Sequence, residues 1–299
     1  MDAESGSGPG DTIAVTGVGW EVSAAAWDAL AGKGAANGWM EHDCGPAPYV
    51  KNRKWIKFMG KQDRLALCAA AKALRKPGGG QPSAPDGCDL FITVGYIPFG
   101  EPQARSLALD SQEDGRFSMD AFSNVALGKV NPVLAFSLLP NMPAHHIAAN
   151  LEIDGEYMVT YPGQGQAYHC LQEASARLRE GVAKAVLLGG TADQCNFLVE
   201  NHWRKIRPGG GGALVDGAAF ILLELQSRAQ KRGAAPMARL AALNEGVCQT
   251  PDNGAETEMN LGPFGLPLRL AAAMAQGQSG FTHRLAADGM AYVSRWELP

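Results

Sequence analysis

The chain has 299 residues, of which 46% are hydrophobic and 19% charged, and 26 basic against 30 acidic side chains give a net charge of −4. This balance argues against a nucleic-acid groove and a patch for anionic membranes, which both need clustered positive charge, and no apolar stretch approaches the roughly 18 residues that span a bilayer. We expect a cytoplasmic protein without a secretion signal, and the low charged fraction indicates that a partner covers part of the surface.

The first third of the chain begins with a leader and continues with alternating elements. Residues 1–11 carry too few apolar side chains to pack, which predicts a disordered leader. The apolar and helix-forming runs then predict a strand over 12–20, a helix over 23–33, a helix over 62–74 and a strand over 89–94. Residues 34–60 show no clear period.

The middle of the chain has the most regular pattern. It predicts a helix over 141–151, a strand over 156–161, a helix over 164–179 and a buried strand over 184–188. Strand, helix and strand at these spacings predict a β-α-β unit with a parallel sheet. The last third predicts strands over 218–225, 238–243 and 290–296, with a helix over 266–275.

The cysteines form no pattern that predicts a metal site or a disulfide scaffold. They are Cys44, Cys68, Cys88, Cys170, Cys195 and Cys248. None lies in a C-x-x-C pair, so we expect small buried hydrophobic side chains in a reducing compartment. His145 and His146 would point about 100° apart on a helix. Since the glycine runs also match no phosphate or dinucleotide pattern, we expect no metal and no cofactor.

The stretch 155–174 places a glutamine where a nucleophile often stands. A strand ends at Tyr161, a Pro-Gly turn follows, and a helix begins around Gln164. Such a turn presents a side chain at a helix N-terminus, where the dipole and free N–H groups stabilise negative charge. An amide neither attacks carbonyls nor takes protons at neutral pH, and Cys170 lies more than a turn and a half away. The residues alone therefore predict the shape of a site without its chemistry.

Several stretches, in order and at matching spacings, carry a resemblance to a known family. They are Asn131-Pro132, Pro140-Asn141-Met142, Gly155, the Gln164 apex, Arg179-Glu180-Gly181, and the stretches 62–74, 186–190, 216–224 and 229–234. Together they resemble the β-ketoacyl synthases over most of the chain. The resemblance implies an α/β, thiolase-like αβαβα layered fold with a shortened C-terminal half. Residues 12–215 would form the N-terminal half and 216–299 the C-terminal half of one integrated domain.

The sequence departs from this family at its catalytic positions. A condensing enzyme has a cysteine at the apex, where this chain has Gln164, and a His-Gly-Thr-Gly-Thr loop that this chain lacks. In the stretch 257–263, Glu258 stands for the family lysine and Pro263 for its histidine, and the closing Gly-Phe-Gly-Gly motif reduces to Gly280-Phe281. Claisen condensation needs a thiolate and groups that stabilise the enolate. The resemblance therefore implies a retired active site with no catalytic residue.

Within this family, a glutamine apex is typical of the chain length factor of type II polyketide synthases. The resemblance implies a noncatalytic subunit that forms a heterodimer with a full-length ketosynthase and limits polyketide or polyene chain length on an acyl carrier protein. A reduced version, such as those of aryl polyene systems, would explain the short C-terminal half. The alternatives are a malonyl-thioester decarboxylase that uses Gln164, and a thiolase-fold hydrolase with another nucleophile.

The resemblance also implies an interface and an acyl tunnel. Synthases of this fold pair the strand before the apex across a two-fold axis; here that strand is Glu156, Tyr157, Met158, Val159, Thr160 and Tyr161. The alternative is an internal strand. By position, the side chains that would limit the tunnel by their bulk are Phe117, Met119, Phe122 and Leu134. The alternative for these four is ordinary core packing.

Overall fold

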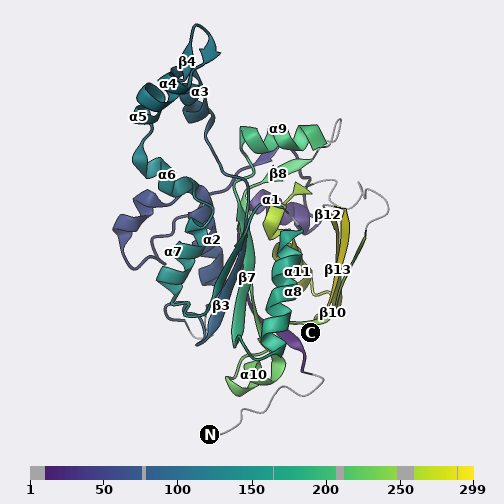
Figure 1. Ribbon diagram of the computed structural model, residues 1–299. Helices are drawn as coiled ribbons and strands as arrows, with labels where there is room; N and C mark the ends of the chain where they lie inside the picture. Colours follow the sequence, from purple (N-terminus) through teal and green to yellow (C-terminus); the bar gives the residue numbers. More distant parts are fainter. Residues whose placement is uncertain (1–10, 76–78, 164, 207–211, 248–258, 288) are drawn as a thin grey trace.

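The strands of the protein form one large mixed sheet and two small ones. The computed structural model describes residues 11–75, 79–163, 165–206, 212–247, 259–287 and 289–299 (Figure 1). The large sheet has the order β12-β13-β10-β1-β9-β7-β3-β6. Its strands are β1 (Ile13–Val22), β3 (Cys88–Val94), β6 (Tyr157–Thr160), β7 (Ala185–Ala192), β9 (Gly217–Leu225), β10 (Ala238–Val247), β12 (Gly280–Ala287) and β13 (Met290–Glu297). The small sheets contain β2 (Trp39–Met40), β8 (Ala213–Val215) and β11 (Met259–Asn260), and the pair β4 (Gln112–Glu113) and β5 (Arg116–Phe117).

Helices cover both faces of the central strands. Helices α2 (Lys61–Ala73) and α7 (Met142–Leu151) lie on one face, and α8 (Gln166–Arg179) and α11 (Gly265–Ala275) lie on the other (Figure 1). The remaining elements outside 101–139 are α1 (Ala24–Leu30), η1 (Arg53–Phe58), α9 (Phe197–Ile206), α10 (Gln226–Lys231) and η3 (Gly262–Phe264). None of the helices in the described part of the chain is both long and apolar enough to cross a bilayer.

The sheet turns at the contact of β1 with β10. Strand β1 pairs with β9 along its whole length but with β10 at Ala14 and Val15. Beyond this contact, β10, β13 and β12 form a further layer on the outer side of α8 and α11 (Figure 1). Alternate residues of β12 and β13 are buried, while Thr282, Arg284 and Arg295 are exposed. In the described ranges no helix covers this outer face.

Two cores separate the layers. The core under α2 and α7 includes Leu65, Leu90, Ile147, Leu187 and Phe220. The core between the central strands, α8, α11 and the outer strands includes Tyr168, Leu171, Leu270, Leu285 and Trp296. Helix α2 approaches β1 closely because β1 carries glycines there: a Cβ at Gly19 would lie 2.2 Å from the carbonyl oxygen of Ala69. The Gly17-x-Gly19 pattern therefore serves helix packing.

The predicted elements are present with shifted boundaries. Strands β3 and β7 are parallel, as are β3 and β6, which confirms the parallel β-α-β unit. The strand predicted over 184–188 continues to Ala192, because Gly189 and Gly190 let Phe220 and the backbone of Pro263 pack closely against it. Helix α8 begins at Gln166 rather than at 164. Strand β12 and helix α9 were not predicted, and neither was any helix or strand within residues 101–139.

Residues 101–139 form an arm that projects from the sheet (Figure 1). We call residues 101–139 the arm; it contains α3 (Glu101–Asp110), the β4–β5 pair, α4 (Met119–Ala121), η2 (Phe122–Ala126, a π-helix), α5 (Leu127–Lys129) and α6 (Pro132–Leu138). Its exposed large apolar side chains are Leu109, Phe117, Met119, Val125, Leu127, Phe136 and Leu139. Exposed apolar groups gathered in this way are typical of an interaction surface.

Most of the predicted leader lies outside the described residues, which begin at residue 11. Asp11, its last residue, is held against α10, because its carboxylate accepts hydrogen bonds from the backbone N–H and the hydroxyl of Ser227. The N-terminal connection to β1 is therefore anchored at the same end of the sheet as α10.

Acid should weaken the fold through His146 on α7. This side chain is buried, and neither ring nitrogen has a hydrogen-bond partner. Burial, with a smaller contribution from His145, lowers the pKa of His146 to about 4, while the unfolded chain has a pKa of about 6.5. Between these values the unfolded state binds more protons, so stability is lost as the pH falls from about 6.5 towards 4. At pH 5 the loss from this one group is about 2 kcal/mol.

We expect His146→Leu to reduce the difference in unfolding free energy between pH 7.5 and pH 5 by about 2 kcal/mol. Urea unfolding at the two pH values measures it. His145→Leu is the matched control, because His145 is the exposed neighbour on the same helix. An equal acid loss in the wild type and in His146→Leu would show that the imidazole of His146 is not kept neutral by the fold.

Candidate functional site

A cavity of about 280 Å³ opens where the parallel strands β3 and β6 end and β7 leads into the next loop. The carboxyl ends of parallel strands meet at one edge of a sheet, which is the usual place for a ligand in such folds. The cavity is lined by Gly95, Tyr96, Pro162, Gly163, Gln194, Val199, His202, Trp203, Asn260, Gly262, Pro263, Ala286 and Ala287.

The two residues that precede the predicted apex line this cavity. Gln164 is outside the described residues, but Pro162 and Gly163, which precede it, both line the cavity. Gly163 has a φ of 137°, a backbone conformation that suits glycine. Helix α8 begins two residues after position 164. The turn between β6 and α8 therefore faces the site, as the strand–turn–helix pattern predicted.

The structure brings the predicted histidine counterpart to the same place. Pro263 in η3 is buried and lines the cavity together with Pro162 and Gly163. Its carbonyl packs against β7, because a Cβ at Gly190 would lie 2.5 Å from the Pro263 oxygen. Glu258, the predicted lysine counterpart, lies outside the described residues.

Two polar pairs line the cavity. The hydroxyl of Tyr96 lies 3.0 Å from Nε2 of His202, and Nε2 of Gln194 donates to Oδ1 of Asn260 at 3.0 Å. The same Oδ1 accepts from the backbone N–H of Gly262. No thiol, carboxylate or ammonium group is present among the described lining residues. The pairs can orient a polar ligand, but they supply no nucleophile of the kind that carries an acyl chain.

Cys170 is not a substitute nucleophile. Its thiol lies in the core between the hydroxyls of Thr93 and Thr160, with Sγ 3.7 and 3.5 Å from their oxygens. Burial raises the pKa of this thiol, and only the thiolate is strongly nucleophilic. Cys170 therefore packs as a hydrophobic side chain, as predicted, and so do Cys88 and Cys195.

A buried ion network supports the cavity from behind. Nζ of Lys61 lies 3.0 Å from Asp193 and 2.8 Å from Asp216. Asp216 is fully buried and also accepts the backbone N–H groups of Gln194 and Cys195, so it fixes the chain that carries Gln194 into the cavity. Burial, and next the neighbouring Asp216, raise the pKa of Asp193 to about 6. Burial alone would lower the pKa of Lys61, but the two carboxylates raise this pKa above its ordinary value.

The predicted interface strand lies at the edge of the large sheet. Strand β6 is the last in the strand order and pairs with β3. The backbone N–H of Leu90 donates to the carbonyl oxygen of Glu156, so the N–H groups of Tyr157 and Val159 face the free edge. Tyr157 is 69% exposed and Tyr161 is 41% exposed. The alternative interpretation, that β6 is an internal strand of the sheet, is therefore wrong. That residues 156–161 form an interface with a partner stays a prediction.

The four predicted tunnel residues lie on the arm and not in the cavity. Phe117 and Met119 are each 64% exposed, so ordinary core packing is wrong for these two. Phe122 is half-buried, with its ring centroid 6.1 Å from that of Phe117, and Leu134 is half-buried on α6. These side chains can limit a tunnel only where a second chain completes it, which remains a prediction.

Sequence reasoning missed Tyr96, Gln194, His202, Trp203 and Asn260. They come from four separate segments that no local motif connects. Helix α9 carries His202 and Trp203, and one feature of the sequence could have predicted it. Glu200 and Arg204 are opposite charges four residues apart, a spacing typical of a helix surface, and in the structure they form an ion pair at 2.6 Å.

Comparisons with known proteins identify the fold. No description of a known protein family matches the sequence, and no curated protein does. One chain of the solved complex AntDE:AntF, a type II polyketide synthase acyl carrier protein with its ketosynthase, matches with a TM-score of 0.70 at 13% identity, over 97% of this chain and 99% of that chain. The ishigamide ketosynthase/chain length factor matches with a TM-score of 0.63 at 16% identity, over 96% and 99%. A β-ketoacyl synthase from Burkholderia phymatum matches with a TM-score of 0.68 at 14% identity, over 97% and 100%.

These likenesses confirm the predicted fold class: the chain has the thiolase-like fold of β-ketoacyl synthases. Because the sequence identities are only 13 to 16%, these matches establish the fold and nothing about the activity. What the chain does has to be argued from its own site and surface.

Proposed function

We propose that this chain is a noncatalytic ketosynthase-like subunit, a chain length factor, that pairs with an active ketosynthase. One observation carries the proposal: the cavity lined by Pro162 and Gly163 offers no thiol, carboxylate or ammonium group among its described lining residues. In the sequence, Gln164 and Pro263 stand where the family has its cysteine and a histidine. A subunit of this kind would complete the acyl tunnel of its partner and limit the length of the polyketide or polyene chain.

The surface supports a large contact with a partner. The free edge of β6 and the exposed apolar side chains of the arm offer main-chain hydrogen-bond groups and apolar area to a second protein. Obligate interfaces bury about 2,000–5,000 Å² and are more hydrophobic than the rest of a surface. Such a contact accounts for the charged fraction of 19%.

A basic segment supports an acidic carrier protein as a second partner. Lys51, Arg53, Lys54 and Lys57 are exposed within seven residues, in and before η1. Of these, Lys51 pairs with Glu152 at 3.2 Å. This segment adjoins the arm, since the rings of Phe58 and Phe136 lie 6.4 Å apart. In the AntDE:AntF complex a carrier protein is bound to its ketosynthase, and here positive charge next to the arm would attract an acyl carrier protein.

The proposal is tested by co-expression with a full-length ketosynthase. We expect a 1:1 complex that elongates chains from malonyl-carrier protein, while the purified chain alone releases no CO₂ from it. Size-exclusion chromatography with light scattering and a CO₂ assay measure both. A chain that remains unpaired with every ketosynthase tested, or decarboxylates by itself, contradicts the proposal.

One observation favours the alternative, a malonyl-thioester decarboxylase that uses Gln164. His202 lines the cavity and hydrogen-bonds Tyr96, so a group able to polarise a thioester is present after all. CO₂ release by the isolated chain that His202→Ala and Gln164→Ala both abolish would establish this second function. His169 is the matched control, because it pairs with Tyr292 away from the cavity lining.

Replacing bulky side chains of the arm with alanine should lengthen the product. If Met119 and Phe122 limit the tunnel by volume, we expect Met119→Ala or Phe122→Ala to shift the products of the complex towards longer chains. Mass spectrometry of the released chains measures the shift. Leu109→Ala is the control, since Leu109 is 61% exposed on the same arm but lies outside the predicted tunnel set. An unchanged product spectrum in both test variants would exclude this assignment.

A further inference from the structure

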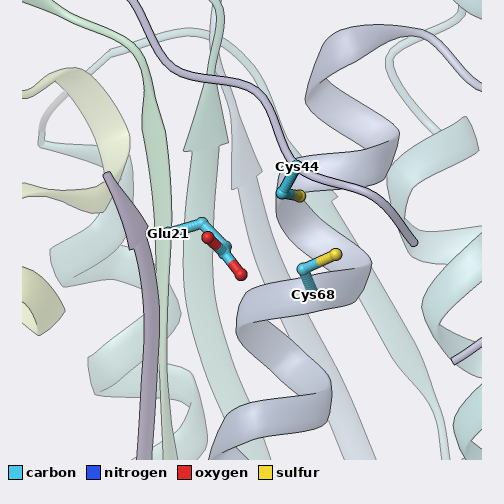
Figure 2. A group of neighbouring side chains, drawn as sticks. All are labelled: Glu21, Cys44 and Cys68. Carbon is cyan, nitrogen blue, oxygen red and sulfur yellow. The ribbon is translucent and has the colours of Figure 1, made fainter. Parts of the chain in front are cut away.

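Two cysteines that are distant in sequence meet a glutamate on the side of α2 that faces β1. Glu21 comes from β1, Cys44 from the loop after β2, and Cys68 from the middle of α2 (Figure 2). One ligand atom of each, the two Sγ atoms and a carboxylate oxygen, lies within 4.8 Å of the others. The cluster lies outside the cavity described above, and the spacing of Cys44 and Cys68 in the sequence did not predict that they are neighbours.

A fourth donor lies beside the cluster. Nε2 of His42 is 3.0 Å from Oε2 of Glu21. Two ligands bound to one tetrahedral zinc ion at about 2.0–2.2 Å lie about 3.3 Å apart, so this pair already has the spacing of two ligands of one ion. Two sulfurs, an imidazole and a carboxylate are a donor set that Zn²⁺ accepts and that Mg²⁺ and Ca²⁺ do not prefer.

Neighbouring contacts hold the donors in place. The guanidinium of Arg64 on α2 binds both carboxylate oxygens of Asp43 at 3.0 and 2.6 Å, which ties the loop between His42 and Cys44 to the helix. The thiol of Cys44 donates to the carbonyl oxygen of Arg64 at 3.3 Å. Cys68 is 1% exposed, so its position is set by core packing. His42 is not among the side chains whose ligand atoms all lie within 4.8 Å of one another, so its imidazole has to move towards the two sulfurs for all four donors to bind one ion.

The local charges suit a divalent cation. Two thiolates and one carboxylate exceed the charge of Zn²⁺ by one, and the ammonium of Lys72 lies 2.8 Å from Oε1 of Glu21. Lys72 therefore balances the excess and can keep its hydrogen bond to one carboxylate oxygen while the other binds the ion. The side chains of Glu21 and His42 are 11% and 22% exposed, which leaves a route for the ion from solvent.

We propose that Cys44, Cys68, Glu21 and His42 form a structural Zn²⁺ site that joins the loop of residues 41–45 to β1 and α2. On binding, both thiols lose their protons to solvent and each sulfur forms a bond to the ion, so one Zn²⁺ replaces two protons. The site is closed by four protein donors, which is typical of structural zinc. It does not depend on the proposed function.

The test titrates the full chain, reduced and stripped of metal, with Co²⁺ and then Zn²⁺. We expect one equivalent of Co²⁺ to produce sulfur-to-cobalt charge-transfer absorption and tetrahedral d–d bands, and one equivalent of Zn²⁺ to remove both. Zn²⁺ should also raise the thermal midpoint of the wild type, because it binds the folded state. Binding without a sulfur-dependent band, or substoichiometric binding, overturns the proposal without any variant.

Variants of the proposed ligands distinguish a loss of metal binding at this site from a general effect of replacing a buried thiol. Cys44→Ser and Cys68→Ser should abolish the charge-transfer band and the Zn²⁺-induced shift, and Glu21→Gln should weaken binding by at least tenfold. Cys88→Ala is the matched control, since Cys88 is a buried thiol on β3, and it should bind like the wild type. Equal binding by Cys44→Ser and Cys88→Ala overturns the proposal. A reduced wild-type chain that takes up no metal, and forms only a Cys44–Cys68 disulfide in air, overturns it as well.

Discussion

Replacing Lys61 with Met is expected to lower the free energy of unfolding by about 3–5 kcal/mol. Lys61 lies between two carboxylates, Asp193 and Asp216, that are 13% and 0% exposed as side chains. Methionine keeps the apolar stem but removes the ammonium, so two buried negative groups face each other without a cation. Losing one partner of a buried ion network costs far more than losing a surface pair. Urea unfolding at pH 7.5 measures the change.

The pH dependence of this loss identifies its cause. In the wild type, burial and Asp216 already raise the pKa of Asp193 to about 6, above the value near 3.9 of an unfolded chain. Without Lys61 the pKa rises further, so the folded variant binds a proton that the unfolded chain does not. Its stability therefore increases as the pH falls, and the deficit of Lys61→Met should be smaller at pH 5 than at pH 7.5.

Two further variants serve as controls. Lys54→Met removes an exposed lysine of η1 and should change stability by less than about 0.5 kcal/mol. Adding Asp193→Asn to Lys61→Met replaces one of the two stranded carboxylates with a neutral amide and should recover part of the loss. An unfolding midpoint of Lys61→Met equal to that of Lys54→Met would mean that the network does not hold the fold.

Placing proline at Tyr157 is expected to weaken pairing with a ketosynthase by about 100-fold. The carbonyl of Glu156 binds β3, so the N–H of Tyr157 faces the free edge of β6. Proline there leaves the pairing with β3 intact, but it removes an outward donor and places its ring where a neighbouring strand would lie. A steric and hydrogen-bond cost of about 3 kcal/mol corresponds to that loss of affinity.

The control is Tyr157→Ala, which removes the exposed ring but keeps the N–H. Pull-down and surface plasmon resonance with the ketosynthase measure affinity, and urea unfolding of each isolated chain verifies that the fold is intact. A loss confined to Tyr157→Pro shows strand pairing across the edge, and an equal loss in both variants assigns the contact to the ring. Wild-type affinity in both variants excludes β6 from the interface.

The central layers could be predicted from the sequence, because their residues bury apolar side chains within this chain. Strands β3 and β7 are buried along their whole length, as parallel strands covered on both faces are, and apart from Asp89, Thr93 and Thr191 their residues are apolar or glycine. Strand β12 was missed because its outer face is solvated, so Thr282 and Arg284 interrupt the apolar pattern. The arm gave no clear prediction, since its apolar side chains do not follow the periodicity of a core in this chain.

The candidate site was predictable only where chain neighbours define it. Pro162 and Gly163 follow a strand and precede a helix, and Pro263 belongs to a stretch that resembles a family motif, so these positions were found. Gln194 and His202 reach the cavity from other elements, and no spacing in the sequence connects them. The same holds for Cys44 and Cys68, which become neighbours only when the loop after β2 lies along α2.

The close approach of α2 to β1 limits the residues that can replace two glycines of β1. A Cβ at Gly17 would lie 2.0 Å from the carbonyl oxygen of Ala73, and a Cβ at Gly19 would lie 2.2 Å from that of Ala69. Cys68 precedes Ala69 on the helix and lies close to Glu21, two residues after Gly19 on β1. An alanine at Gly19 would therefore push the helix away from the strand at the place where this cysteine and this glutamate meet.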